Sequence, residues 1–247
     1  MAQKFLNIIM VKYSKKDENS FALGITLLFY LLENRKEDIK RIYLSPSFEK
    51  NETYKKIVKQ AKQESIPLIE NNIKIFKDLS EKDNCLAIGE FKKRFTDLDK
   101  NKNHLVLVNP SNMGNLGTIL RSALAFNIDN IALISPCADP YDPKTIRASM
   151  GSIFSINLQI FSSFGEYRKK YSKHYFYPFM LQAKKQINEI EIDTPYSIIL
   201  GNEATGLDKS FLSIGTPTLI KISNKVDSLN LDNAASIALY EFSKSNK

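Results

Sequence analysis

The second half of the chain alternates short apolar runs with helix-forming segments, and this alternation constrains the fold more than any other feature. Short strands that alternate with helices form a mostly parallel sheet covered on both faces. In such a sheet, ligands bind in the loops that follow the carboxyl ends of the strands. We therefore expect a Rossmann-like α/β domain with its functional residues in those loops. The predicted strands are Leu105–Val108, Ile131–Ser135, Ile156–Phe161, Tyr175–Met180, Ser197–Leu200 and Thr218–Ile222.

The first hundred residues predict a smaller α/β unit. A polar stretch over residues 97–103 has the composition of a linker, so we place the domain boundary near residue 100 and expect domains at 1–100 and 101–247. The elements predicted in the first domain are helices at Leu23–Leu32 and Lys55–Gln63 and strands at Ile42–Leu44 and Cys85–Ile88.

Charge and cysteine content restrict the partners and the compartment. The chain has 35 Lys and Arg against 27 Asp and Glu, a formal net charge of +8, which favours a polyanionic partner such as RNA. Its two cysteines, Cys85 and Cys137, have no metal-ligand spacing, so we expect no metal site. No apolar run reaches the roughly 18 residues that a membrane span needs. With no signal peptide recognised, these features predict a cytoplasmic protein that does not enter a membrane.

The loop after the first strand of the second half is rich in Asn, Gly and Pro and leads into a helix. Leu116, Ile119 and Leu120 fall on one helical stripe, and Arg121 points away from its centre. One interpretation of Arg121 is an ordinary solvated surface arginine. The other is an arginine directed at a phosphate or at developing negative charge.

Two later loops are also unusual. The strand that ends at Leu200 leads into a Gly-rich turn, Gly201–Leu207, in which Glu203 argues against a phosphate cradle. The segment Asp227–Asn230 precedes a C-terminal helix, and Ser228 or Asn230 could simply be its N-cap. Taken separately, each loop is explained by an ordinary turn or a capped helix.

Taken together, the three loops make the chain resemble the SpoU/TrmH family of the SPOUT superfamily. The family's first motif, Asn-x-Gly-x-x-x-Arg, is matched by Asn115, Gly117 and Arg121. The second motif resembles residues 201–207, and the third resembles Ser228-Leu229-Asn230 with the helix that follows. Residues 146–154 are also similar to a family segment. The strong resemblance covers about residues 104–243, and the first hundred residues resemble the family's substrate-binding domain more loosely.

The resemblance implies a fold, a cofactor and an assembly. It implies a small L30e-like N-terminal substrate-binding domain and a C-terminal Rossmann-like sheet whose last part is threaded into a deep trefoil knot. It also implies a homodimer and S-adenosylmethionine as the cofactor, held mainly by backbone groups of the second and third loops. The cofactor-binding residues implied are Leu200, Gly201, Asn202, Glu203, Gly206, Ile220, Ser228 and Leu229.

The resemblance further implies methyl transfer to a ribose 2′-hydroxyl of rRNA or tRNA. The family gives the motif-one arginine, here Arg121, a key role. Because guanidinium stays protonated, we expect Arg121 to hold a phosphate and to stabilise developing alkoxide charge rather than to act as a base. Asn115, Glu203, Ser228 and Asn230 are expected to orient the ribose, the arginine and the cofactor.

Two other functions stay open at this stage. The chain could be an inactive relative that binds RNA without methylating it, although intact Arg121 and Glu203 argue against this. It could instead methylate a base nitrogen, although the Ser-Leu-Asn signature at residues 228–230 favours ribose. A nucleotide-binding oxidoreductase is disfavoured, because the Gly-x-Gly-x-x-Gly fingerprint is absent.

Overall fold

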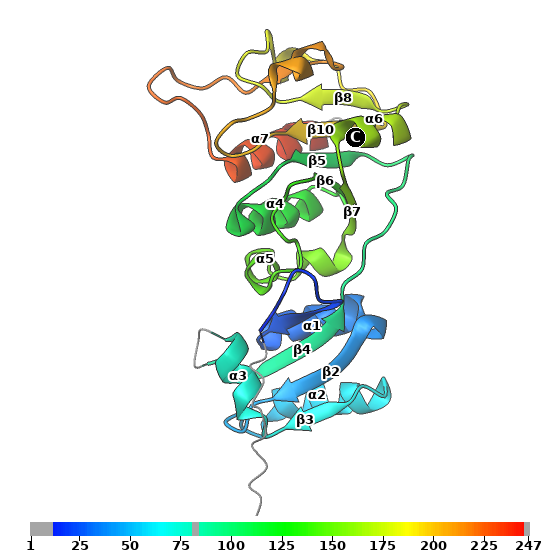
Figure 1. Ribbon diagram of the computed structural model, residues 1–247, viewed down its shortest axis with the longest axis vertical. Helices are drawn as coiled ribbons and strands as arrows, with labels where there is room; N and C mark the ends of the chain where they lie inside the picture. The colour runs from blue at the N-terminus through cyan, green and yellow to red at the C-terminus, as the bar shows by residue number, and fades with distance from the viewer. Residues whose placement is uncertain (1–11, 81–83, 245–247) are drawn as a thin grey trace, which may run out of the picture. The chain divides into compact units, whose positions relative to one another are not determined.

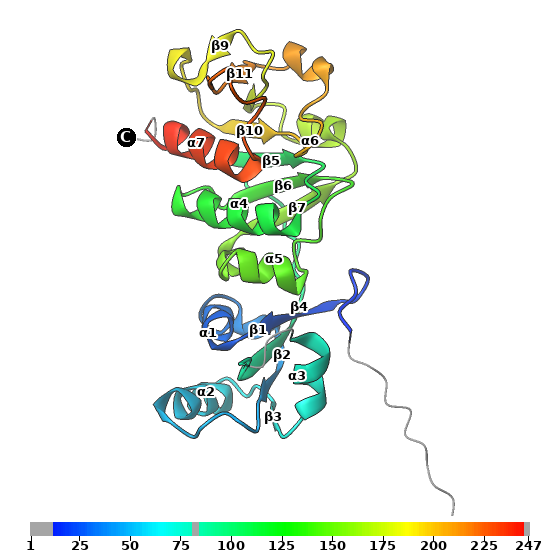
Figure 2. The same ribbon diagram turned by 90° about the vertical axis from the view of Figure 1, so that its left-hand side faces the viewer.

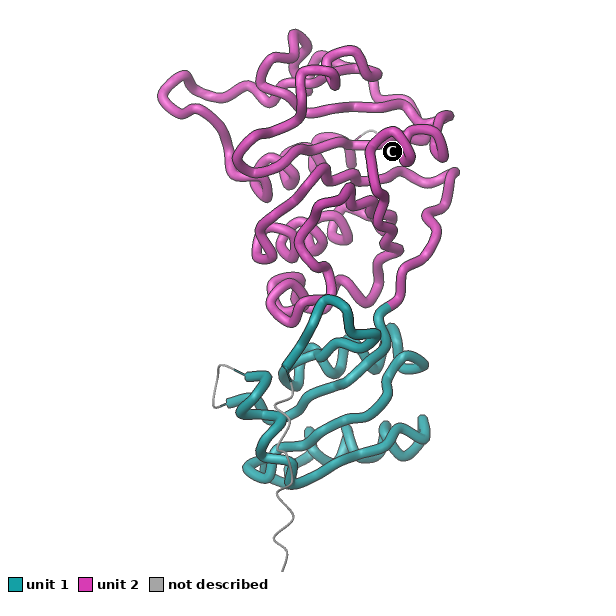
Figure 3. The backbone as a smooth tube through the Cα atoms, viewed as in Figure 1, with its two compact units in different colours: residues 1–93 teal, residues 94–247 magenta. Residues whose placement is uncertain are grey.

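The computed structural model describes residues 12–80 and 84–244. The chain divides into two compact units, residues 1–93 and residues 94–247 (Figure 3). In the described ranges, no helix combines the length and the apolar character that crossing a membrane requires.

The first unit is a four-stranded mixed sheet with helices, and its strand order is β1-β4-β2-β3 (Figure 1). β4 is antiparallel to both of its neighbours, while β2 and β3 are parallel. The strands are β1 (Asn19–Leu23), β2 (Ile39–Leu44), β3 (Leu68–Glu70) and β4 (Ala87–Lys92), and the helices are α1 (Ile25–Asn34), the short 3-10 helix η1 (Lys36–Asp38), α2 (Glu52–Gln63) and α3 (Ile73–Leu79).

Local sequence explains the helices of this unit. α1 buries four leucines on one face against the sheet, and the side chain of Asn51 caps α2 by accepting a hydrogen bond from the backbone N–H of Tyr54. Both predicted helices and both predicted strands are confirmed. The elements β1, β3 and α3 were not predicted, because each is short and lacks a clear apolar period.

The second unit contains a five-stranded, all-parallel sheet with the order β7-β6-β5-β10-β8. The strands of this unit are β5 (His104–Val108), β6 (Asn130–Ile134), β7 (Asn157–Phe161), β8 (Tyr175–Pro178), β9 (Lys185–Gln186), β10 (Tyr196–Leu200) and β11 (Thr218–Leu219). Its helices are α4 (Met113–Ala125), α5 (Pro143–Ala148), α6 (Phe164–Lys170) and α7 (Leu231–Ser243), with 3-10 turns η2 (Ser152–Ser155), η3 (Ile187–Glu189) and η4 (Lys209–Ser213). The expected α/β architecture with a parallel sheet is confirmed. The trefoil knot expected in the C-terminal segment stays a prediction.

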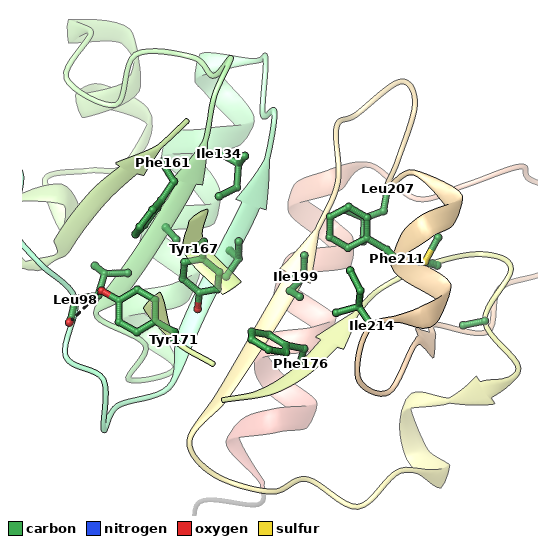
Figure 4. Packing of buried hydrophobic residues seen from close by; sticks show 14 residues of the cluster. Leu98, Ile134, Phe161, Tyr167, Tyr171, Phe176, Ile199, Leu207, Phe211 and Ile214 are labelled. Carbon is green, nitrogen blue, oxygen red and sulfur yellow. Dashed lines mark hydrogen bonds between the residues drawn. The ribbon is translucent and has the colours of Figure 1, made fainter. Parts of the chain in front are cut away.

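Side chains of α6 and η4 fill one face of this sheet. The rings of Tyr167 and Tyr171 and the side chain of Phe211 pack with residues of β6, β8 and β10 in one buried cluster (Figure 4). Among the other helices of this unit, α4 packs between α5 and α7 (Figure 2). The hydroxyls of Ser122 on α4 and Ser236 on α7 lie 3.0 Å apart, which ties these two helices together.

The prediction of a sixth sheet strand at Thr218–Ile222 was wrong. Only Thr218 and Leu219 form a strand, β11, and it pairs with β9 in a separate two-stranded sheet. After Leu219 the backbone leaves the ladder, and Ile220 and Ile222 line a cavity instead. An apolar residue at every second position is therefore explained here by a cavity wall and not by a sheet face.

Both histidines are buried and have structural roles. The Nε2 of His104 lies 2.8 Å from the carbonyl oxygen of Asp99, and its Nδ1 lies 2.9 Å from the hydroxyl of Tyr167. His174 makes equivalent contacts with the carbonyl of Lys100 and the hydroxyl of Ser197. Burial lowers the pKa of His104 to about 4, so the imidazole is neutral at physiological pH. These contacts hold residues 99–100 against the amino ends of the strands.

Gly117 fixes how α4 packs on α5. A Cβ atom at this position would lie 2.5 Å from both the carbonyl oxygen of Thr145 and the Cβ of Ala148, and 2.8 Å from the backbone nitrogen of Ser149. The missing side chain therefore lets the two helices approach closely, which sets the position of the α4 residues that follow.

We predict that Gly117→Ala lowers the free energy of unfolding by about 1–3 kcal/mol, because the methyl group forces the backbone of α5 away from α4. Urea-induced unfolding followed by circular dichroism measures the change. Gly165→Ala is the matched control, because a Cβ at this helical position meets only the Ser163 hydroxyl, at 3.8 Å. Equal stability of the two variants would contradict the prediction.

Candidate functional site

The candidate site lies where the winding of the sheet reverses. β5, β6 and β7 follow one another toward one edge, whereas β10 and β8 lie on the other side of β5. The loops after β5 and β10 are consequently neighbours, and such a reversal is where open parallel sheets bind ligands. The side-chain amide of Asn202 donates a 2.8 Å hydrogen bond to the carbonyl of Asn109, which joins the two loops directly.

The carboxylate of Glu203 is the main link between these loops. Its Oε2 accepts hydrogen bonds from the backbone N–H of Ser111 at 3.1 Å and from the Ser111 hydroxyl at 2.8 Å. Its Oε1 accepts from the backbone N–H of Asn112 at 3.0 Å and, at 3.4 Å, from the amide of Asn115. One carboxylate therefore satisfies otherwise unpaired N–H groups at the beginning of α4.

The environment of Glu203 keeps it ionised. Partial burial by itself would raise the pKa of this carboxyl, but the hydrogen bonds from Ser111 and Asn112 outweigh it, so the pKa lies below its ordinary value. The acidic side chain of this turn thus occupies backbone N–H donors of the neighbouring loop after β5.

The turn after β10 requires its glycines. A Cβ atom on Gly201 would lie 2.2 Å from the carbonyl carbon of Gly206, so no larger residue fits there. Gly206 has a φ of +65°, in the left-handed region that glycine adopts freely. Ala204 is exposed, and its backbone N–H donates to the Asn202 side chain, so its methyl group does not disturb the turn.

A cavity of about 360 Å³ opens beside this turn, within the range of roughly 300–1,000 Å³ typical of ligand pockets. Its walls come from the segments after β8, β10 and β11 and from the beginning of α7. The sequence-predicted cofactor residues all line it: Leu200, Gly201, Asn202, Glu203, Gly206, Ile220, Ser228 and Leu229.

The predicted catalytic residues are distributed differently. Glu203 and Ser228 line the cavity, and Asn115 contacts Glu203. Arg121 lies exposed on α4, and Asn230 is the exposed N-cap residue of α7, where its side chain makes no capping hydrogen bond; neither lines the cavity. Asn230 is thus the N-cap of α7, one of the two residues that the sequence offered for this position, and its backbone carbonyl accepts from the N–H of Ala234.

Sequence reasoning missed one wall of the cavity, residues 179–182. Met180 is buried there, whereas Leu181 is 53% exposed. The sequence also assigned no role to Asp227, which lines the cavity, or to Ser111, which donates to Glu203. The signal for the missed wall was available, because residues 179–182 directly follow β8, and loops after parallel strands carry ligand sites.

The walls combine apolar surface with backbone polar groups. Leu200, Leu207 and Leu231 supply apolar surface, while the Gly201–Gly206 turn brings backbone groups to the cavity. In the described ranges, no group of three or more histidine, cysteine or acidic side chains could hold a metal ion.

The fold and the site define an α/β protein with a cofactor-sized cavity at a topological switch point. The chain belongs to the SpoU rRNA methylase family, whose model matches residues 102–240. A second model, described as RNA 2′-O ribose methyltransferase substrate binding, matches residues 21–85. The inferred resemblance to this family is thereby confirmed.

Curated relatives match a little over half of the chain. The chain is 34% identical over 140 residues to an uncharacterized tRNA/rRNA methyltransferase of Synechocystis, covering 56% of this chain and 51% of that protein. It is 31% identical over 140 residues to the 23S rRNA (uridine(2479)-2′-O)-methyltransferase of Streptomyces viridochromogenes, covering 53% of this chain and 49% of that protein. The chain thus matches about half the length of these relatives.

Solved structures match the fold over both units. The SpoU methyltransferase AviRb of Streptomyces viridochromogenes, solved in complex with the cofactor AdoMet, superimposes with a TM-score of 0.80 at 19% identity. That comparison covers 93% of this chain and 91% of the other. At this identity, the likeness concerns the fold alone.

We predict that Glu203→Ala loosens the loop at residues 109–112 and lowers the free energy of unfolding by about 1–3 kcal/mol, because it leaves several hydrogen-bond donors without an acceptor. Hydrogen–deuterium exchange of residues 109–115 is the measurement, and faster exchange is expected. Glu166→Ala is the matched control, since Glu166 accepts the same kind of bonds from Ser162 but at the beginning of α6. Unchanged exchange at residues 109–115 in Glu203→Ala would show that the Glu203 carboxylate does not hold this loop in place.

Proposed function

We propose that this protein is an S-adenosylmethionine-dependent RNA methyltransferase that acts on a ribose 2′-hydroxyl of rRNA or tRNA. The observation that carries the proposal is the cavity at the β5/β10 switch point, where the residues of the second and third family motifs meet and Glu203 links them to α4. The family membership of residues 102–240 supports the same activity.

The residues present fit the cofactor. An adenosine moiety needs apolar walls and backbone hydrogen-bonding groups, and Leu200, Gly201, Gly206 and Leu229 supply them. When bound, S-adenosylmethionine supplies a methyl group activated by its sulfonium charge. The protein's own task is then to position the ribose hydroxyl and to stabilise the charge that develops on it.

Arg121 is suited to that second task. Its side chain is exposed, and among residues 12–80 and 84–244 no ion pair or hydrogen bond occupies its guanidinium. A free guanidinium on the helix that also carries Asn115 can bind a phosphate of the RNA and stabilise the oxygen as it loses its proton. Glu203 acts through Asn115 and the α4 N-terminus, so we assign it a positioning role rather than contact with the ribose.

The first unit is proposed to bind the RNA substrate. The substrate-binding model matches residues 21–85, and the net charge of +8 favours a polyanion. The relative from Streptomyces viridochromogenes is named for 23S rRNA, whereas the one from Synechocystis is named for tRNA or rRNA. The proposal therefore names RNA ribose as the substrate class and leaves both RNA types for the assay.

We predict that Arg121→Ala reduces methyl transfer by about 100-fold or more, since it removes charge stabilisation in the transition state. The protein is incubated with radiolabelled S-adenosylmethionine and total RNA lacking its modifications, and label is sought in alkali-resistant dinucleotides. Arg168→Ala, which removes an exposed arginine from α6, is the control and should keep activity. Label in a base would favour the nitrogen methyltransferase, and cofactor binding without transfer to any RNA would favour the inactive RNA-binding relative.

We further infer that the protein forms a homodimer through α4 and α7. The outer surface of these helices carries Ile237 and Tyr240, which are 38% and 51% exposed, and the Tyr240 ring meets Phe126 edge-on with centroids 5.9 Å apart. Apolar side chains gathered on one helical surface are typical of subunit contacts. α7 packs against α4, the helix that carries Arg121, so a partner subunit on this surface would come close to the site.

We predict that Tyr240→Asp raises the dimer dissociation constant by about tenfold or more, because a carboxylate would be buried in the interface. Light scattering coupled to size-exclusion chromatography over a concentration series gives the constant. Leu212→Asp is the matched control, because Leu212 is 39% exposed in η4, where the neighbouring Phe211 packs against Phe164 of α6. A wild-type protein that is monomeric at every concentration would overturn the proposal of a homodimer.

A further inference from the structure

The cavity wall carries very little charge. Among the residues that line it, only Glu203 and Asp227 are ionisable acids, and none is basic. All its other members are apolar, small or neutral polar residues. The two carboxylates therefore decide which ionic group of a ligand the cavity accepts.

Only one of these carboxylates is available. Glu203 is occupied by donors from the loop after β5, as described above. Asp227 is exposed, and within the described part of the chain its carboxylate has no ion-pair or hydrogen-bond partner. It lies directly before Ser228 and Leu229, on the segment that closes the cavity beside the beginning of α7.

A carboxylate in this place works against RNA binding, because it repels phosphate groups. The chain as a whole is basic, with 35 Lys and Arg against 27 Asp and Glu. An acidic side chain on the cavity wall is better explained by a cationic group of the small ligand. S-adenosylmethionine carries two such groups, the sulfonium and the α-ammonium of its methionine part.

We propose that the Asp227 carboxylate binds the α-ammonium group of S-adenosylmethionine and so determines specificity for ligands that carry the amino-acid tail. The inference rests on the proposed function. The ammonium is preferred over the sulfonium because it has three N–H donors that can form charge-assisted hydrogen bonds with a carboxylate, whereas the sulfonium has none. An exposed carboxylate also suits the polar end of the ligand, while the purine requires the buried leucines.

The assignment predicts a pattern across three ligands. S-adenosylmethionine and S-adenosylhomocysteine both carry the α-ammonium, but only the first carries the sulfonium. Methylthioadenosine has neither charge. Asp227→Asn should therefore lower the affinity for the first two ligands alike, by about fivefold to twentyfold. It should change the affinity for methylthioadenosine by less than about twofold.

Isothermal titration calorimetry of the full chain with each ligand tests this without any need for turnover. Asp227→Glu, which keeps the charge, should retain most of the affinity, and Asp232→Asn is the control because Asp232 lies at the beginning of α7 outside the cavity wall. Circular dichroism of each variant establishes that it folds.

The outcomes separate the alternatives. Loss of affinity for S-adenosylmethionine alone would assign Asp227 to the sulfonium and overturn the ammonium assignment. Equal loss for all three ligands would make Asp227 a structural residue, and no loss for any would remove it from recognition; either result overturns the proposal. Failure of the proposed function would look different, because the wild-type protein would then bind none of the three ligands.

Discussion

The parallel pairing of β5 with β10 is the constraint on which the rest of the site depends. It places the ends of two strands side by side although they are separated by some ninety residues of chain. Backbone groups at strand ends and at the beginning of a helix cannot pair within their own elements. The side chains of Glu203 and Asn202 form hydrogen bonds with such backbone groups in the loop after β5. These two neighbouring residues therefore join the cavity to the beginning of α4.

Close backbone approach supplies the shape of the site, and it depends on missing side chains. Gly201 lets the turn after β10 fold back on Gly206, and Gly117 lets α4 lie against α5. Both positions belong to family motifs, and in both the reason is steric rather than chemical. A motif glycine here thus determines where neighbouring side chains lie, while the functional groups that we propose come from Asn115, Arg121 and the loop at residues 227–229.

Charge is divided between the surfaces of the second unit. The cavity has carboxylates and no basic residue, whereas Arg121 stands exposed on α4. Such a division suits a reaction between a cationic cofactor and a polyanionic substrate, because each partner meets the opposite charge at its own place. The exposed apolar residues of α7 lie on a helix that packs against α4, so the proposed dimer surface and the proposed catalytic arginine belong to one helix pair.

By itself the sequence determined the α/β class, the strands predicted at residues 105–108, 131–135 and 197–200, and the loops that carry the motifs, because apolar periodicity and glycine placement are local properties. The family motifs also indicated many of the residues that line the cavity. Only the tertiary structure decided that Ile220 and Ile222 form a cavity wall instead of a strand, that Glu203 bridges two loops, and that residues 179–182 complete the cavity. These features arise from contacts between segments far apart in the chain, and no local pattern encodes which loops a parallel sheet brings together.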